Sequence, residues 1–301
     1  FFMIRKNISI IILFSCFPFA IYSYEPKDIK KLKSTNECWN CDFSKADLTN
    51  INLEKSVLGN SNFQGADLRG TSFRQAYLNK ADFRHANLRG VVFDLAMLEG
   101  AKLSFLKLNK GNFMLANMKW TNLTGIQLRG ANLKGARLDG AKLTGADLSE
   151  INLEKASLKG TNLKGANLMR ANLFKAYFHG ANLERANLSF ADLTAAELNE
   201  ANLSYANLNG AKMSGTVLYK ANLTGAKLQG VFLVISDLRE ANLNSTDMKR
   251  ANLGYSNLKG SDLTKTNLTE TNLKNAKISL NQLKKSILFK TIMPNGKIIS
   301  N

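Results

Sequence analysis

Two cysteines separated by two residues, in the stretch Cys38-Trp39-Asn40-Cys41, are the residues best suited to chemistry. In proteins, this spacing serves as a redox pair, as half of a metal site or as a local disulfide. No second pair of this kind follows, and His85 and His179 lie far away along the chain. The spacing alone therefore leaves a structural disulfide, free thiols and a redox or metal role open.

No other catalytic set stands out in the sequence. There is no GxSxG elbow, no HExxH helix, no phosphate-binding glycine loop and no dinucleotide fingerprint. Many Asp and Asn residues precede leucines, and we interpret them as outward polar groups that hydrogen-bond along the chain. We therefore predict a protein that is not an enzyme and that has no catalytic residues, metal, cofactor or small-molecule substrate.

Most of the chain, which must position the cysteine pair and the polar residues, repeats every five residues. This period fits neither a helix nor a strand. From Phe43 to Leu288, every fifth residue is Leu, Phe, Met or Ile, and no insertion shifts the register. The residue two places earlier is Ala in most units, as in Ala131 and Ala136. A fixed period held this long predicts a solenoid in which each unit buries its apolar face against its neighbours.

The pattern A-(N/D)-L-x-x resembles the pentapeptide-repeat family over residues 41–288. The resemblance implies an all-β solenoid: a right-handed quadrilateral β-helix of about twelve coils, each made of four pentapeptides. Residues twenty apart then stack, so Phe43, Phe63 and Phe83 form one inner column. Exported members often carry two cysteines directly before the first repeat, which favours a structural disulfide between Cys38 and Cys41.

Some members of that family bind type II topoisomerases by imitating the negative charge of DNA. This chain has a formal net charge of +18. We therefore do not expect it to be a DNA mimic.

The two ends differ from the repeat. Residues 1–23 combine a basic start with a short apolar run, which predicts a signal peptide and export to the periplasm or outside the cell. A lipoprotein modified at Cys16 and a membrane-anchored protein are the alternatives. Residues 24–40 are predicted to cap the first coil, with a short helix over 26–35. Residues 289–301 form a C-terminal cap or tail, in which Ile298 and Ile299 fold over the last coil.

The basic residues spread over all four predicted faces, the first of which holds Phe43. A solvated surface that keeps the rod soluble is the favoured interpretation. The alternative is weak binding of anionic polymers, such as nucleic acid, lipopolysaccharide or a membrane surface. Its candidate contacts form a stripe on the second face, which we call the basic stripe: Arg69, Arg89, Lys107, Lys110 and Arg129.

Two groups of apolar residues occupy outward positions, which favours contact with a protein partner or with a second copy of this chain. Bulky residues that merely pack on each other are the alternative. The first group is Val57, Tyr77, Val92, Leu95, Met97, Met114, Leu115 and Trp120. The second group is Tyr219, Phe232, Val234, Ile235 and Tyr255.

Overall fold

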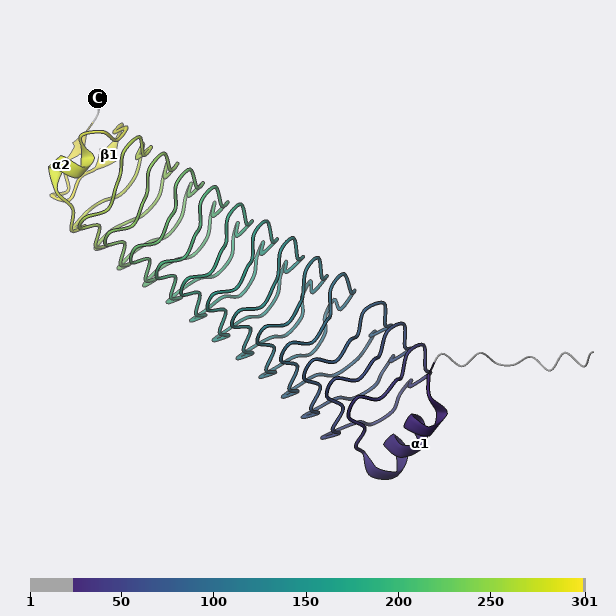
Figure 1. Cartoon of the computed structure of the whole chain (residues 1–301). Helices are drawn as coiled ribbons and strands as arrows, with labels where there is room; N and C mark the ends of the chain where they lie inside the picture. The colour runs from purple at the N-terminus through teal and green to yellow at the C-terminus, as the bar shows by residue number, and fades with distance from the viewer. Residues whose placement is uncertain (1–23, 300–301) are drawn as a thin grey trace, which may run out of the picture.

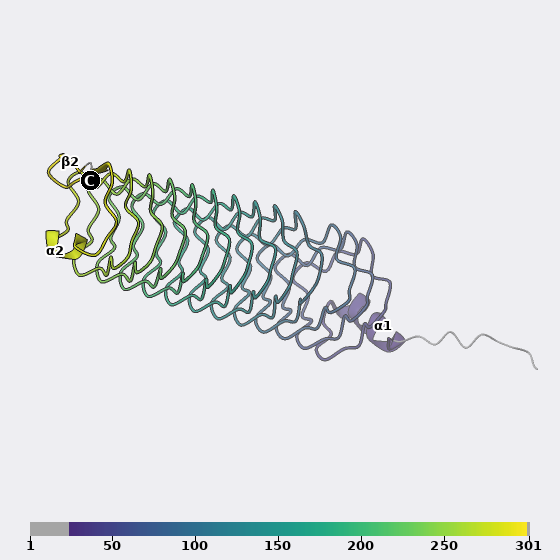
Figure 2. The same ribbon diagram turned by 90° about the horizontal axis from the view of Figure 1, so that it is seen from above.

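The chain winds into a straight rod of stacked coils, as the ribbon views show (Figures 1 and 2). The computed structural model describes residues 24–299, and the predicted signal peptide lies outside them. Parallel bridges join residues twenty apart, from Glu37 with Val57 to Asn272 with Ile292. Each coil therefore contains four pentapeptides, as the family resemblance implies.

The interior of the rod is one continuous apolar core. The central residue of each pentapeptide and the small residue two places before it point inward, so Leu143 and Ala141 are both buried. The small residue leaves room for the large one in so narrow a tube. Because each coil packs on its neighbours, the core extends along the whole rod rather than forming one central cluster.

The predicted aromatic column is confirmed in the N-terminal coils, and a second column lies beside it. The rings of Phe43, Phe63 and Phe83 stack with centroids 4.9–5.0 Å apart. Phe73 and Phe93 stack at 5.4 Å in a second column, where Phe113 follows at 5.1 Å. Rings of the two columns meet edge to face at 5.7–5.9 Å. Both arrangements suit the aromatic quadrupole and add to the stabilisation from burial.

Each corner of a coil is a tight turn. The N–H of Ala46 donates to the carbonyl of Phe43, and Lys45 between them has a φ of 56°. A positive φ at this place is the geometry of a type II turn, which favours glycine. Many corners nevertheless hold other residues, such as His85 and Phe105. The corner N–H usually donates to the next coil, as Lys45 does to Gln64 at 2.9 Å, and this bond offsets part of the strain.

Glycine corners differ in what surrounds them, which gives a matched test. A Cβ on Gly140 would lie 2.1 Å from the ring of Trp120, whereas a Cβ on Gly145 would meet nothing within 4 Å. Both have similar positive φ values. We expect Gly145→Ala to cost about 1 kcal/mol and Gly140→Ala about 1–2 kcal/mol more, because the ring must move. Chemical denaturation would measure the difference, and equal losses would contradict it.

The N-terminal end of the rod carries α1, Pro26–Thr35, over the residues predicted to be helical. Leu32 is buried, and Ile29 packs against the core. Asp28 accepts a hydrogen bond from the N–H of Asp42 at 2.8 Å, which ties the helix to the first coil. Among residues 24–299, no helix has the length and apolarity that a membrane span requires.

The C-terminal end departs from the repeat earlier than the sequence predicts. The short helix α2, Leu280–Leu283, interrupts the predicted array, and Ser279 and Gln282 form a capping box at its start. The strands β1, Thr291–Ile292, and β2, Ile298–Ile299, then form an antiparallel hairpin. Ile299 packs on the core as predicted, but Ile298 is exposed because neighbouring strand residues point to opposite faces.

Candidate functional site

Cys38 and Cys41 form a disulfide beneath α1. Both are buried: Cys41 occupies the small inward position of its unit, and the Cys38 sulfur lies 3.5 Å from the carbonyl oxygen of Asp28. Sulfurs bonded to each other cannot serve as thiolate ligands or nucleophiles. In this state the pair joins the helix-bearing segment to the first coil.

The Asn and Asp residues that precede the central leucines have a structural role. The Asn172 side chain accepts from the N–H of Phe174 at 3.2 Å, and its amide donates to Asn152 in the preceding coil at 3.1 Å. Such ladders run along several faces, for example from Asn222 through Asn202 to Asn182. These groups are therefore engaged in the scaffold, as the sequence predicts.

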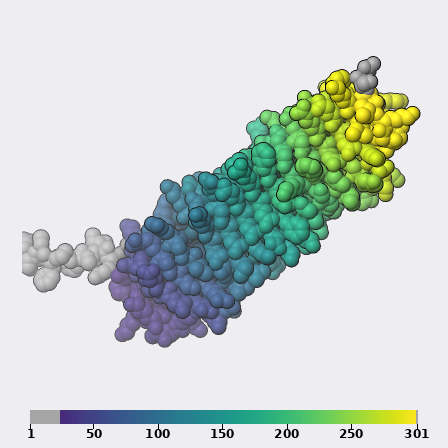
Figure 3. All heavy atoms as spheres, turned by 180° about the vertical axis from the view of Figure 1, so that it is seen from behind, coloured from purple at the N-terminus to yellow at the C-terminus, as the bar shows by residue number. Residues whose placement is uncertain are grey.

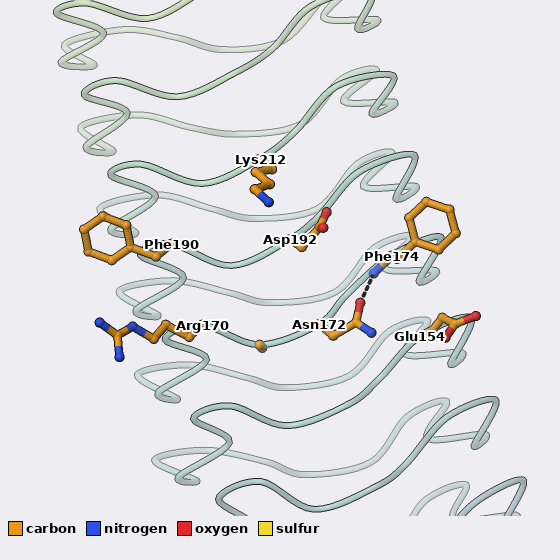
Figure 4. Close-up of a pocket in the computed structure, with 8 residues that line it drawn as sticks. Glu154, Arg170, Asn172, Phe174, Phe190, Asp192 and Lys212 are labelled. Carbon is orange, nitrogen blue, oxygen red and sulfur yellow. Dashed lines mark hydrogen bonds between the residues drawn. The ribbon is translucent and has the colours of Figure 1, made fainter.

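A shallow trough of about 480 Å³ on the third face is lined by such Asn and Asp side chains (Figure 4). Asn172, Asp192 and Lys212 lie along its floor. Its edges carry Arg170 and Phe190 on one side, and Glu154 and Phe174 on the other.

The carboxylates of the trough are held in the ionised form or engaged with the backbone. A hydrogen bond from Lys134 at 2.9 Å lowers the pKa of Glu154 below its usual range. Asp192 accepts from the N–H of Thr194 at 3.0 Å. The lowered pKa makes Glu154 unsuitable as a general acid, because that role needs a raised pKa. His85 and His179 are exposed and lie nearly five coils apart, and neither lines the trough.

Asp82 is the most buried carboxylate among the described residues. Burial raises the pKa of Asp82. Hydrogen bonds from Arg84 at 2.7 Å and Lys102 at 3.3 Å, together with the charge of Arg84, outweigh this effect, so the net pKa lies below its usual range. A depressed pKa stabilises the fold above the unfolded value of about 3.9, and this stabilisation is lost as pH falls through the folded value.

We therefore expect Asp82→Asn to be less stable than the wild type at pH 7, and the two to converge below about pH 3. Urea melts across this range would measure the difference. A gap that stays constant with pH would show that the carboxylate charge contributes nothing.

Large apolar side chains at the corners lie over glycines of the next coil. A Cβ on Gly125 would meet the ring of Phe105 at 2.5 Å, and Gly135 is likewise covered by Leu115 at 2.7 Å. The same relation holds between Trp120 and Gly140. Packing on a glycine explains why a bulky residue is tolerated at these corners. It does not bury the side chain, since Phe105 and Trp120 remain 74% and 66% exposed.

The first apolar group is spread along two faces. Val57, Tyr77 and Met97 form successive bridges on the fourth face, as predicted. Met114, Leu115 and Trp120 are exposed at or beside the corners of a single coil, whereas Val92 and Leu95 are only half-exposed. The sequence interpretation missed Phe105, which projects from another corner of that coil. It could have been found by inspecting the fifth place of every unit.

The second apolar group does not form one cluster. Phe232, Val234, Ile235 and Tyr255 belong to the third face or its corner. Tyr219 lies on the fourth face, where the guanidinium of Arg239 and the ammonium of Lys220 lie 5.5 and 5.1 Å from its ring. This residue is engaged with its own neighbours.

The basic stripe divides into paired and unpaired cations. Arg69 forms an ion pair with Asp67 at 2.7 Å, and Arg129 forms one with Glu150 at 2.9 Å. Arg89, Lys107 and Lys110 make no ion pair with any residue between 24 and 299. These three line a common cleft of about 720 Å³.

Comparison with known families gives matches over most of the chain. A family model described as pentapeptide repeats, in eight copies, matches residues 112–152, 151–189, 181–218, 216–254 and 246–280. A second model, described as a pentapeptide repeat region, matches residues 37–113. No protein among the curated ones matches the sequence significantly.

Several solved structures are similar to this chain. HetL, a pentapeptide repeat protein involved in heterocyst differentiation regulation in the cyanobacterium Nostoc, is 30% identical over 91% of this chain and 98% of its own, with a TM-score of 0.44. QnrB1, a plasmid-mediated fluoroquinolone resistance protein, is 16% identical over 75% of this chain and 92% of its own, with a TM-score of 0.35. A pentapeptide repeat protein from the Arabidopsis thaliana thylakoid lumen is 22% identical over 56% of this chain and 85% of its own, with a TM-score of 0.21.

Proposed function

Because the chain belongs to the pentapeptide-repeat family, whose members form right-handed quadrilateral β-helices, we propose that it is a non-enzymatic rod that binds another protein. We further propose that it is exported, that α1 caps one end and that its array comprises about twelve coils. Proteins of this family are generally structural or binding proteins. The structural roles of the carboxylates in the trough support the same conclusion for this chain.

The observation that carries the proposal is the concentration of large apolar side chains on one coil. Phe105, Leu115 and Trp120 project from three corners of the coil formed by residues 103–122, and each is more than half exposed. Phe105 and Trp120 border the first face, whereas Trp120 and Leu115 border the fourth. Exposed aromatic residues held on a rigid scaffold are typical anchors of protein interfaces.

Binding of anionic polymers is less well supported. Two of the five cations in the basic stripe, Arg69 and Arg129, are already neutralised by acidic neighbours. A straight polyanion along the stripe would therefore contact few free charges, and its affinity would vanish near physiological salt.

A paired set of variants tests protein binding. The double variant Phe105→Ser/Trp120→Ser removes two corner aromatics that lie over glycines, and Phe190→Ser/Tyr205→Ser removes two equivalent ones elsewhere. We expect a partner from an envelope extract to be retained by the wild type and by the second variant but lost from the first. The proposal would be contradicted if the wild type and the second variant retained no partner, or if both variants retained the partner equally.

A further inference from the structure

The ladder of hydrogen bonds between coils is interrupted between residues 85–91 and 104–112. Elsewhere between α1 and residue 258, each coil is joined to the next by a regular series of N–H donations. Five successive members are missing here. The N–H groups concerned belong to His85, Leu88, Gly90, Lys107 and Asn112, and their expected acceptors are the carbonyls of Ser104, Lys107, Asn109, Ala86 and Val91, respectively.

The interruption coincides with an exception in the repeat. The small inward position on the second face holds Ala46, Ala66 and Ala86 in successive coils, and then Leu106. Leucine is much bulkier than alanine, and the coils separate where its side chain lies beneath Ala86. The bridge expected between Asn87 and Lys107 is also absent. In Figure 1 the ribbons are more widely spaced where the dark-blue coils give way to teal.

The separation opens the cleft of about 720 Å³ that the three unpaired cations line. We call it the ladder cleft. Its walls are residues 87–92 on one side and 107–112 on the other. They contain Arg89, Lys107 and Lys110 but no acidic residue, and Leu88 and Leu108 contribute apolar atoms. In the view from behind, the atoms of neighbouring coils form a continuous surface along the rod (Figure 3).

The lips of the ladder cleft present backbone donors and acceptors in the pattern of an unpaired strand edge. On one lip, Leu88 and Gly90 offer N–H groups. On the opposite lip, Lys107 and Asn109 offer carbonyl groups. Gly90, Lys107 and Asn109 are exposed, so water can pair with their backbone groups in the free protein, and a ligand that supplies both donors and acceptors can replace that water. A simple anion accepts hydrogen bonds but does not donate them to the carbonyls, whereas an extended peptide does both.

We propose that the ladder cleft binds an extended, acidic segment of a partner protein, whose backbone pairs with the open lips and whose carboxylates meet Arg89, Lys107 and Lys110. Strand addition to an exposed edge is an established mode of peptide recognition, in which backbone hydrogen bonds give affinity and side chains give selectivity. The net charge of the cleft selects acidic over basic peptides. This inference rests on the proposed protein-binding function and specifies one site and one ligand chemistry for it.

The probe for a direct test is a fluorescein-labelled hexapeptide of alternating Glu and Val, measured by fluorescence anisotropy with the full chain. We expect saturable binding by the wild type. The variant Arg89→Gln/Lys107→Gln/Lys110→Gln should bind at least about tenfold more weakly, because all three charges that face the peptide are lost. Its control, Lys142→Gln/Lys227→Gln/Lys259→Gln, removes the same charge from exposed lysines that form no ion pair within residues 24–299. It should change the affinity less than about twofold.

A second probe separates strand pairing from charge attraction. The same hexapeptide with alternate backbone nitrogens methylated keeps its charge but loses the donors that strand pairing needs. We expect it to bind at least about tenfold more weakly, and we expect the unmodified peptide to slow amide exchange at Leu88, Gly90 and Lys107. Equal binding of both peptides, equal effects of the two triple variants, or no saturable binding would overturn the inference.

These outcomes are independent of the test of the proposed function. If the hexapeptide fails to bind but Phe105→Ser/Trp120→Ser still loses a partner that the control retains, the inference about the cleft fails and the protein-binding function stands. If the hexapeptide binds as expected and no partner depends on the corner aromatics, the cleft is supported and the apolar surface is not the interface.

Discussion

Replacing Leu143 with Asp is expected to lower the free energy of unfolding by about 4–5 kcal/mol and to open the coils around it. The Leu143 side chain is buried in the core between Leu123 and Leu163, which are twenty residues away on either side. A carboxylate at this position would have no cation or water beside it. Because each coil contacts only its neighbours, the damage should begin locally and then weaken the whole rod.

The control is Thr144→Asp, one residue further along and half-exposed. Aspartate is already compatible with this place in the unit, since Asp94 occupies it and accepts a hydrogen bond from the N–H of Met114 at 2.9 Å. We expect this variant to cost less than about 0.5 kcal/mol. Thermal melts and limited proteolysis would compare the two proteins. Similar losses in both would show that the inward and outward positions are not those described.

The fold was predictable because a solenoid repeats one five-residue unit many times, with the same residues pointing inward in each unit. A strict apolar residue at every fifth place indicates that each pentapeptide contributes one inward residue. The family resemblance implies four pentapeptides per coil, so residues twenty apart stack. The columns of Phe43, Phe63 and Phe83 follow directly. The short helix α2 could not be obtained in this way, because Leu280–Leu283 still keeps an apolar residue in register while Ser279 and Gln282 form a local capping box.

The surface was less predictable, because it depends on neighbours within one unit. The stripe of arginines on the second face was inferred from residues twenty apart. Arg69, however, pairs with Asp67 two residues earlier, and the same geometry recurs where Arg239 pairs with Asp237 at 2.7 Å. The second and fourth places of a unit lie side by side, so an Asp-x-Arg sequence indicates a neutralised pair. Inspection of that short motif would have removed Arg69 from the free cations.

The opening in the ladder had a signal that the sequence analysis did not use. Leu106 is the one leucine at the small inward position, and Gly111 follows at the next such position. Ile51, Ile126 and Ile151 have the same volume at this position and leave the ladder intact, so the sequence does not say whether the core repacks or the coils separate. That outcome depends on how Leu106 packs beneath Ala86, which only the three-dimensional arrangement gives.

Replacing Phe63 with Ala is expected to be one of the most damaging large-to-small changes in the N-terminal coils, with a loss of about 4–5 kcal/mol. Its ring contacts three others, with centroids 5.0 Å from Phe43, 5.8 Å from Phe73 and 4.9 Å from Phe83. The variant therefore loses both buried area and the favourable ring geometry of all three contacts. The cavity cannot collapse easily, because the backbone ladder holds the coils on either side at a fixed spacing.

Two comparisons isolate the aromatic contribution of Phe63. Phe178 is equally buried but lies in a later coil, between Leu158 and Leu198 in its column. We expect Phe178→Ala to cost about 1–2 kcal/mol less than Phe63→Ala, because it removes a similar volume without breaking an aromatic stack. Phe63→Leu, which introduces the residue found at most central positions, should recover about half of the loss. Denaturant melts would rank the three variants. If Phe178→Ala proved as costly as Phe63→Ala, the aromatic columns would contribute only through the area they bury.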